Sequence, residues 1–155
     1  MRSQAHWIAA SQLPFKRALV VTILMNQIIY FKTSMFDVLK EKENPINPIH
    51  GISLLEWLRE ELKGKLDITE PDAEDWGWYS ELDFEGNNYL IGACAQFEEG
   101  DDPEIEIDWI FQVDKLRSFK EKIFGKNKMS VTDNCFVFFK ELFENHPNIK
   151  EVQVG

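Results

Sequence analysis

The stretch WGWYSELDFEGNNYLIGACAQF at residues 76–97, followed by EIEIDWIFQV at residues 104–113, decides the fold. Side chains of a β-strand point alternately to the two faces of a sheet, and these segments alternate apolar with polar residues at that spacing. Glu85-Gly86-Asn87-Asn88 supplies a turn between the first two segments, because glycine and asparagine tolerate a positive φ. We therefore predict three consecutive antiparallel strands at residues 76–84, 87–97 and 104–113.

The turn also predicts how the first two strands pair. If Gly86-Asn87 forms a two-residue loop, counting outward places Trp78 opposite Ala95 and Trp76 opposite Phe97. Trp76 and Trp78 then share the core-facing side of one strand. A slip by one residue would turn an apolar set toward water, so the pairing is well specified. The third strand alternates so sharply that we expect one of its faces in the core and the other in solvent.

Outside this region, helix and strand signals complete the fold. Ser53 and Glu56 form a predicted capping box for a helix that ends at Gly64, and Ser118 with Glu121 forms a second one. A phenylalanine-rich helix follows Thr132 or Asp133, and residues 26–32 and 150–154 are predicted strands. The order β-α-β-β-β-α-α-β indicates an α+β protein, a two-layer sandwich in which helices pack on one face of a mostly antiparallel sheet.

Length and composition indicate one domain. The chain has 155 residues and is 44% hydrophobic with twelve phenylalanines, which excludes a disordered chain. We place a single α+β domain at residues 25–155. Residues 1–24 have three basic residues and no acid, an apolar run too short to span a bilayer, and no signal-cleavage site. We expect them to be an upstream extension outside the fold, since Met25 is a natural start; a targeting segment is the alternative.

The charge balance limits the partners. Seventeen basic against twenty-seven acidic residues give a net charge of −10, which argues against nucleic acid and suits a basic protein partner. No membrane partner is expected, and the oligomeric state stays open. Cys94 and Cys135 lie in apolar surroundings and are expected to be structural thiols, so a reducing cytoplasm is the expected compartment.

Motifs for catalysis and metal binding are not found. His6, His50 and His146 are scattered without a second ligand at metal-binding spacing, and no G-x-S-x-G, P-loop or G-x-G-x-x-G occurs. We therefore assign no metal, no cofactor and no catalytic residue. Whether the protein is an enzyme stays undecided, but the lack of an assignable nucleophile–base pair favours a protein that only binds.

Two features could form a site. Trp76 and Trp78, with Gly77 between them, could form an aromatic platform for a ligand, or they could simply fill the core. A basic segment in an otherwise acidic protein could hold a phosphate or an acidic partner, or it could only neutralise the acidic tracts at 67–75 and 98–102. The proposed anion-binding residues of this segment are Lys115, Arg117, Ser118, Lys120, Lys122, Lys126 and Lys128.

Several stretches together resemble a family of small acidic bacterial proteins. They are NPINPI at 44–49 with Gly51, LLEWL at 54–58, EPDAEDWGWY at 70–79 and RSFKEKIFGKNKM at 117–129. The resemblance covers roughly residue 27 to the C-terminus and leaves 1–24 outside. It implies a bacterial cytoplasmic protein and no known activity.

The sequence supports two hypotheses of function. The first is a non-enzymatic binding or inhibitor protein that acts on a basic protein, as immunity proteins act on nucleases, because opposite potentials speed encounter. The alternative is a small-molecule or phosphate-binding domain that uses Trp76, Trp78 and the basic segment at 115–128.

Overall fold

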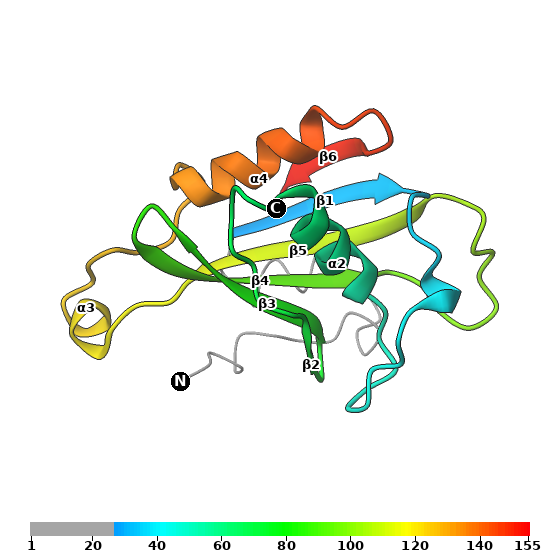
Figure 1. Ribbon diagram of the computed structural model, residues 1–155, viewed down its shortest axis with the longest axis horizontal. Helices are drawn as coiled ribbons and strands as arrows, with labels where there is room; N and C mark the ends of the chain where they lie inside the picture. Colours follow the sequence, from blue (N-terminus) through cyan, green and yellow to red (C-terminus); the bar gives the residue numbers. More distant parts are fainter. Residues whose placement is uncertain (1–26) are drawn as a thin grey trace.

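Six strands form one antiparallel sheet in the computed structural model, which describes residues 27–155. The strand order is β2-β3-β4-β5-β1-β6 (Figure 1). The three strands predicted from residues 76–113 are confirmed as the consecutive neighbours β3, β4 and β5. The expectation about residues 1–24 lies outside the described part of the chain. The strands are β1 Gln27–Thr33, β2 Asp72–Glu74, β3 Gly77–Phe84, β4 Asn87–Ala95, β5 Ile107–Lys115 and β6 Lys150–Val154.

The helices confirm the α+β architecture. Both longer helices contribute to the same core on one face of the sheet, so the helices form one layer and the sheet the other (Figure 1). Within residues 27–155, no helix has the length and apolar character that crossing a membrane requires. The helices are the 3-10 turn η3 Val38–Lys40, α2 Ile52–Glu61, α3 Phe119–Ile123 and α4 Asn134–Glu144.

The predicted turn between β3 and β4 is displaced by one residue, which moves the register by two. The loop is Glu85-Gly86, whose φ angles are +52° and +82°, and Asp83 Oδ1 accepts a hydrogen bond of 3.1 Å from the Gly86 amide. Trp78 therefore lies opposite Ala93 and not opposite Ala95. A two-residue shift keeps every side chain on its predicted face, so the apolar pattern could not distinguish the two registers.

The placement of Trp76 on the same side as Trp78 is wrong. Strand β3 begins at Gly77, whose φ of +149° interrupts the alternation of side chains. Trp78 packs in the main core, while Trp76 belongs to a second cluster on the opposite face of the sheet. A Cβ atom on Gly77 would lie 2.5 Å from the Ala93 carbonyl oxygen, so this crossing of the chain requires glycine.

Helix α2 is capped by a residue far away in sequence, and the predicted Ser53–Glu56 capping box does not form. The helix begins at Ile52, one residue before Ser53. The Glu41 carboxylate accepts hydrogen bonds from the Gly51 amide at 3.0 Å and from the Ser53 amide at 2.7 Å. A carboxylate at this position satisfies amides that the first helical turn leaves unpaired and interacts favourably with the helix dipole.

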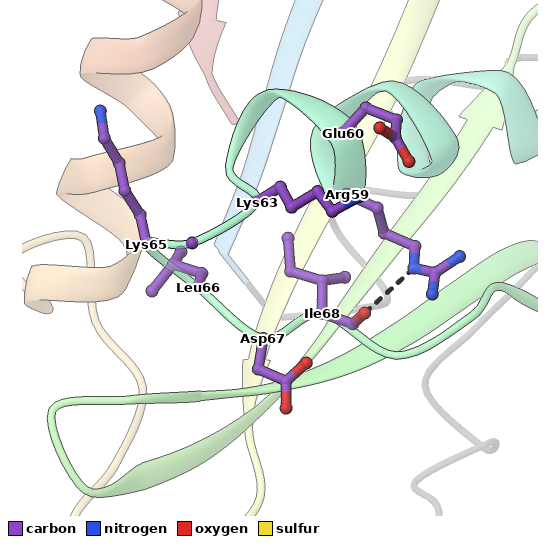
Figure 2. A pocket seen from close by; sticks show the side chains of 8 residues that line it. Arg59, Glu60, Lys63, Lys65, Leu66, Asp67 and Ile68 are labelled. Carbon is purple, nitrogen blue, oxygen red and sulfur yellow. Dashed lines mark hydrogen bonds between the residues drawn. The ribbon is translucent and has the colours of Figure 1, made fainter.

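Past the C-terminal end of α2, the chain turns back along the helix. Gly64 has a φ of +86°, and Arg59 Nε donates a hydrogen bond of 3.0 Å to the Ile68 carbonyl oxygen (Figure 2). This contact ties the helix to the segment that leads into the sheet.

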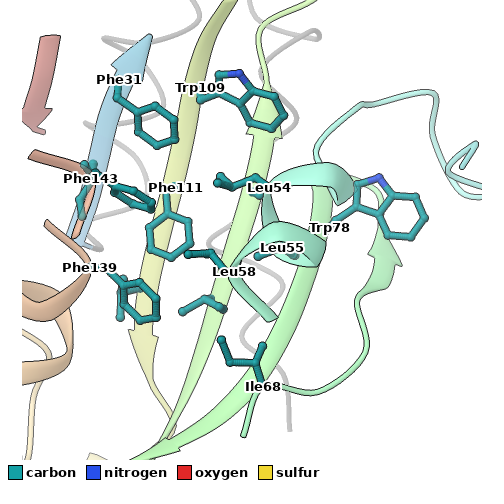
Figure 3. Packing of buried hydrophobic residues seen from close by; sticks show 14 of the residues in the cluster. Phe31, Leu54, Leu55, Leu58, Ile68, Trp78, Trp109, Phe111, Phe139 and Phe143 are labelled. Carbon is teal, nitrogen blue, oxygen red and sulfur yellow. The ribbon is translucent and has the colours of Figure 1, made fainter. Parts of the chain in front are cut away.

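The main core lies between the two helices and the sheet. Leucines of α2 and phenylalanines of α4 point onto aromatic side chains of β1, β3 and β5 (Figure 3). Phe111 of β5 lies at the centre, with its ring centroid 5.1 Å from that of Phe139 and 5.0 Å from that of Phe143. The predicted phenylalanine stripe on this helix is therefore buried against the sheet. Fully buried core side chains include Leu54, Leu55, Phe136, Phe139, Phe143, Phe31, Phe111, Trp78 and Trp109.

The opposite face of the sheet is also buried in part. Ile110 and Gln112 of β5, on the face predicted to be in solvent, are 5% and 0% exposed, so that prediction is wrong. Ile110 lies in a second apolar cluster. That cluster draws its side chains from four strands and two loops. Its buried members are Ile28, Ile49, Trp76, Tyr79, Leu90, Cys94 and Ile110.

Candidate functional site

Both indoles of the proposed aromatic platform are buried. Trp76 is 3% exposed and Trp78 is 2% exposed, and they lie on opposite faces of the sheet. The Trp78 Nε1 atom donates a hydrogen bond of 3.1 Å to the Ile49 carbonyl oxygen. The interpretation in which the rings fill the core therefore describes their burial, although they fill two different clusters.

Asn44 connects two of the stretches that carried the family resemblance. Its side-chain amide donates hydrogen bonds of 3.0 Å to the carbonyl oxygens of Glu74 and Gly77, and its Oδ1 atom accepts from the amide of Ile46. The side-chain Nδ2 atom of Asn47 donates a hydrogen bond to the Asp75 carbonyl oxygen. The NPINPI loop thus holds the β2–β3 turn in place, which gives both stretches a structural role.

Lys115, the first residue of the proposed anion site, forms an ion pair with a carboxylate of the protein itself, that of Asp133. Its Nζ atom lies 2.7 Å from Asp133 Oδ2, and the two side chains are 9% and 6% exposed. The Tyr89 hydroxyl also donates to Asp133, at 2.9 Å. Asp133 in turn caps α4 by accepting from the Cys135 amide, as predicted for this helix. The cluster joins the ends of two strands to the start of a helix.

The protonation of this cluster follows from its surroundings. Burial alone would raise the pKa of Asp133, but hydrogen bonds from Lys115, Tyr89 and the Cys135 amide outweigh it and hold the pKa below its ordinary value. Burial, and then the negative charge of Asp133, raise the pKa of the Cys135 thiol. Burial and the hydrogen bond to Asp133 also raise the pKa of Tyr89. The thiol is therefore protonated and unreactive at neutral pH, and the cluster is structural.

The remaining proposed anion ligands lie on a projecting segment at one end of the molecule. Arg117 Nη1 donates a hydrogen bond of 3.2 Å to the Lys126 carbonyl oxygen. Ser118 forms the predicted capping box with Glu121 at the start of α3. The four other lysines of the proposed site are exposed: Lys120, Lys122, Lys126 and Lys128. The structure thus divides the seven residues between a buried ion pair, a helix cap and an exposed surface.

The same segment exposes large apolar side chains that sequence reasoning missed. Phe119, Ile123 and Phe124 are 79%, 61% and 64% exposed. Helical periodicity treats such residues as core. The signal that could have identified them is the shortness of α3, whose five residues between two polar loops leave no helical face long enough to reach the sheet.

Within the β4–β5 connection, residues 98–106 form an acidic loop at the opposite end of the molecule from α3 (Figure 1). Every acidic side chain in the loop is exposed. The apolar side chain of Ile105, which lies between two of these acids in the sequence, is 57% exposed. The backbone is shaped by short contacts, such as the 2.8 Å hydrogen bond from the Glu98 amide to Asp101 Oδ2. The loop's acids are Glu98, Glu99, Asp101, Asp102, Glu104 and Glu106.

A serine, a glutamate and a histidine meet at the start of α2, without the order that nucleophilic catalysis needs. The Ser53 hydroxyl donates a hydrogen bond of 2.6 Å to Glu41 Oε2, and His50 Nδ1 lies 3.3 Å from Glu41 Oε1. In a hydrolytic triad the histidine lies between the hydroxyl and the carboxylate. Here the carboxylate, whose side chain is 1% exposed, lies between the other two, which identifies it as a helix cap.

The structure also forms a hollow that sequence reasoning did not predict. An open depression of about 510 Å³ lies where α2 ends, lined by cationic, acidic and apolar side chains (Figure 2). Arg59 and Ile68, which both line it, are joined by the hydrogen bond from Arg59 Nε to the Ile68 carbonyl oxygen. Across residues 27–155, histidine, cysteine and acidic residues form no group of three that could hold a metal ion.

Comparison of the chain with models of known protein families, with curated proteins and with solved structures yields no match.

Proposed function

We propose that the protein is a non-enzymatic binding or inhibitor protein, similar in action to immunity proteins, and that it docks on a basic protein partner. The acidic loop at residues 98–106 carries this proposal, because it places six exposed acidic residues and the exposed Ile105 within nine positions. Glu106 among them pairs with Lys150 at 2.6 Å. Interfaces join charge complementarity, which steers the approach, to apolar contacts, which hold the complex. A net charge of −10 extends the same attraction to longer range.

The arrangement of polar groups supports binding over catalysis. Ser53 and His50 contact Glu41 and not each other, and the Cys135 thiol is buried with a raised pKa. The Lys115 ammonium is held by Asp133. Each of these groups has a structural task at a helix start or in the core.

The test is a copurification from the native host with two matched variants. The triple substitution Glu99→Gln/Glu104→Gln/Ile105→Ser removes two charges and the apolar group from the loop. It spares the carboxylates of Asp101 and Asp102, which accept backbone hydrogen bonds. Glu60→Gln/Glu61→Gln removes the same charge from exposed positions on α2.

We expect the wild type and the α2 variant to retain a basic protein whose capture weakens with salt, and the loop variant to lose it. Equal capture by all three proteins, or capture only of acidic proteins, would contradict the proposal.

A further inference from the structure

The segment from Arg117 to Lys128 forms a tip with both apolar and basic chemistry. Phe119 and Ile123 are one helical turn apart on α3, and Phe124 follows directly. All three are more than half exposed. Four exposed lysines surround them, at positions 120, 122, 126 and 128. Exposed apolar groups of this size gathered at one place mark a surface that meets another body.

Hydrogen bonds fix the shape of the tip and attach its base to the sheet. The Lys126 amide donates 2.8 Å to the Glu121 carbonyl oxygen, and Arg117 reaches back to the carbonyl of Lys126, which closes the segment on itself. Asn127 fixes the base of the tip, because it donates to Asn87 Oδ1 at 3.1 Å and accepts from Lys115 Nζ at 3.0 Å. The phenyl rings are therefore presented outward by a preorganised support, which reduces the entropy lost on docking.

We propose that this tip docks on the surface of an anionic phospholipid bilayer. The lysines complement the lipid phosphates, and the rings of Phe119 and Phe124 enter the boundary between headgroups and acyl chains, as in interfacial helices with basic and aromatic residues. This proposal departs from the expectation of no membrane partner, which rested on the lack of a spanning segment; contact at the bilayer surface needs no such segment. The proposal is independent of the basic protein partner, which engages the acidic loop at the other end of the molecule.

The placement of charge favours a bilayer over an acidic protein. The tip stands at the end of the long axis of the molecule, beyond the sheet, while the acidic loop lies at the far end (Figure 1). At physiological salt the Debye length is about 8 Å, so repulsion between the acidic body and the membrane is screened while the tip is in contact. A projecting apolar group needs a shaped pocket in a protein partner, whereas a fluid bilayer accepts it without one.

The experiment is sedimentation of the full-length protein with two kinds of vesicles, one of phosphatidylcholine alone and one of an equimolar mixture with phosphatidylglycerol. The apolar variant is Phe119→Ser/Ile123→Ser/Phe124→Ser, and its control replaces exposed apolar residues elsewhere, Leu39→Ser/Ile46→Ser. The basic variant is Lys120→Gln/Lys122→Gln, and its control removes two other exposed lysines, Lys63→Gln/Lys65→Gln. The four control positions lie outside the tip: Leu39 is in η3, Ile46 lies between η3 and α2, and Lys63 and Lys65 follow α2.

We expect binding to the anionic vesicles that decreases as salt is added, and little binding to phosphatidylcholine alone. The apolar variant should lower the partition coefficient about tenfold or more. The basic variant, which removes two of the four tip lysines, should weaken the salt dependence to about half, and both controls should bind like the wild type. Soluble glycerophosphate should not displace the protein, since it cannot receive the apolar side chains.

Three results would overturn the proposal. One is equal binding of the wild type and the apolar variant. Another is equal binding to both kinds of vesicles. The third is concentration-dependent self-association that requires the tip and occurs without lipid, because it would assign the tip to a second copy of the chain.

Discussion

Lys115 at the end of β5 and Asp133 at the start of α4 form an ion pair of 2.7 Å, with both side chains almost completely buried. Lys115→Met should therefore cost about 3 kcal/mol of unfolding free energy, because it leaves a buried carboxylate without its cation. Urea denaturation measures this cost.

The double variant Lys115→Met/Asp133→Asn is the control for this prediction. Since it removes both charges, it should lose less than the sum of the two single variants. Additive losses would mean that the two side chains do not interact in solution.

Acidification should narrow the difference in stability between the wild type and Asp133→Asn. The pKa of Asp133 is lower in the folded protein than in the unfolded chain, because its hydrogen bonds and the Lys115 charge favour the carboxylate. On acidification the unfolded chain takes up the proton first, so the stabilisation is complete above the ordinary aspartate pKa of about 4 and is lost as pH falls through the folded value. Urea midpoints measured from neutral pH down to about pH 3 test this, and a constant difference would contradict it.

Glu41, and not Glu56, should stabilise the start of α2. Glu41→Ala removes the acceptor of two backbone amides and of the Ser53 hydroxyl, and should cost about 2 kcal/mol. Glu56 is exposed, so Glu56→Ala should change stability by less than about 0.5 kcal/mol. Thermal unfolding of the two variants compares the observed cap with the capping box that the local sequence suggested. A larger loss of stability in Glu56→Ala than in Glu41→Ala would mean that the Ser53–Glu56 capping box forms in solution.

Gly77 and Gly86 should respond differently to alanine. Gly86→Ala places a side chain at a φ of +82° with open space around it, so it should cost about 1 kcal/mol of strain. Gly77→Ala adds a clash with the Ala93 carbonyl to a φ of +149° and should cost about 3 kcal/mol or more. Chemical denaturation of both variants measures the difference, and similar costs would show that the close approach is relieved without strain.

The sequence predicted which face each strand residue occupies better than it predicted where the strands pair. The periodicity of two places Trp78 and Leu82 on the core side in both registers, so it cannot distinguish Ala93 from Ala95 as the partner of Trp78. The observed register requires a positive φ at Glu85, which is uncommon for glutamate, so the turn residues favoured the wrong two-residue loop.

Other features were hidden because they depend on residues distant in sequence. Glu41 caps a helix that begins eleven positions later, and Asn44 holds a turn thirty residues away. Trp76 left its predicted face because Gly77 changes the direction of the chain where it passes the Ala93 carbonyl. A local pattern contains no information about such a crossing.

The basic segment shows the same limit for the candidate site. The sequence shows the charge of this segment. It does not show that Lys115 forms a buried ion pair while Lys120 and Lys122 stay exposed, because that difference depends on where Asp133 lies. The exposure of Phe119, Ile123 and Phe124 follows from the length of α3, whose five residues are too few to pack against the sheet.

The positions of the acidic loop and the lysine-bearing tip at opposite ends of the long axis give the molecule a permanent electric dipole (Figure 1). In the field of any charged body such a molecule experiences a torque before it makes contact. This torque favours end-on encounters, in which the sign of the approaching charge decides which end arrives first.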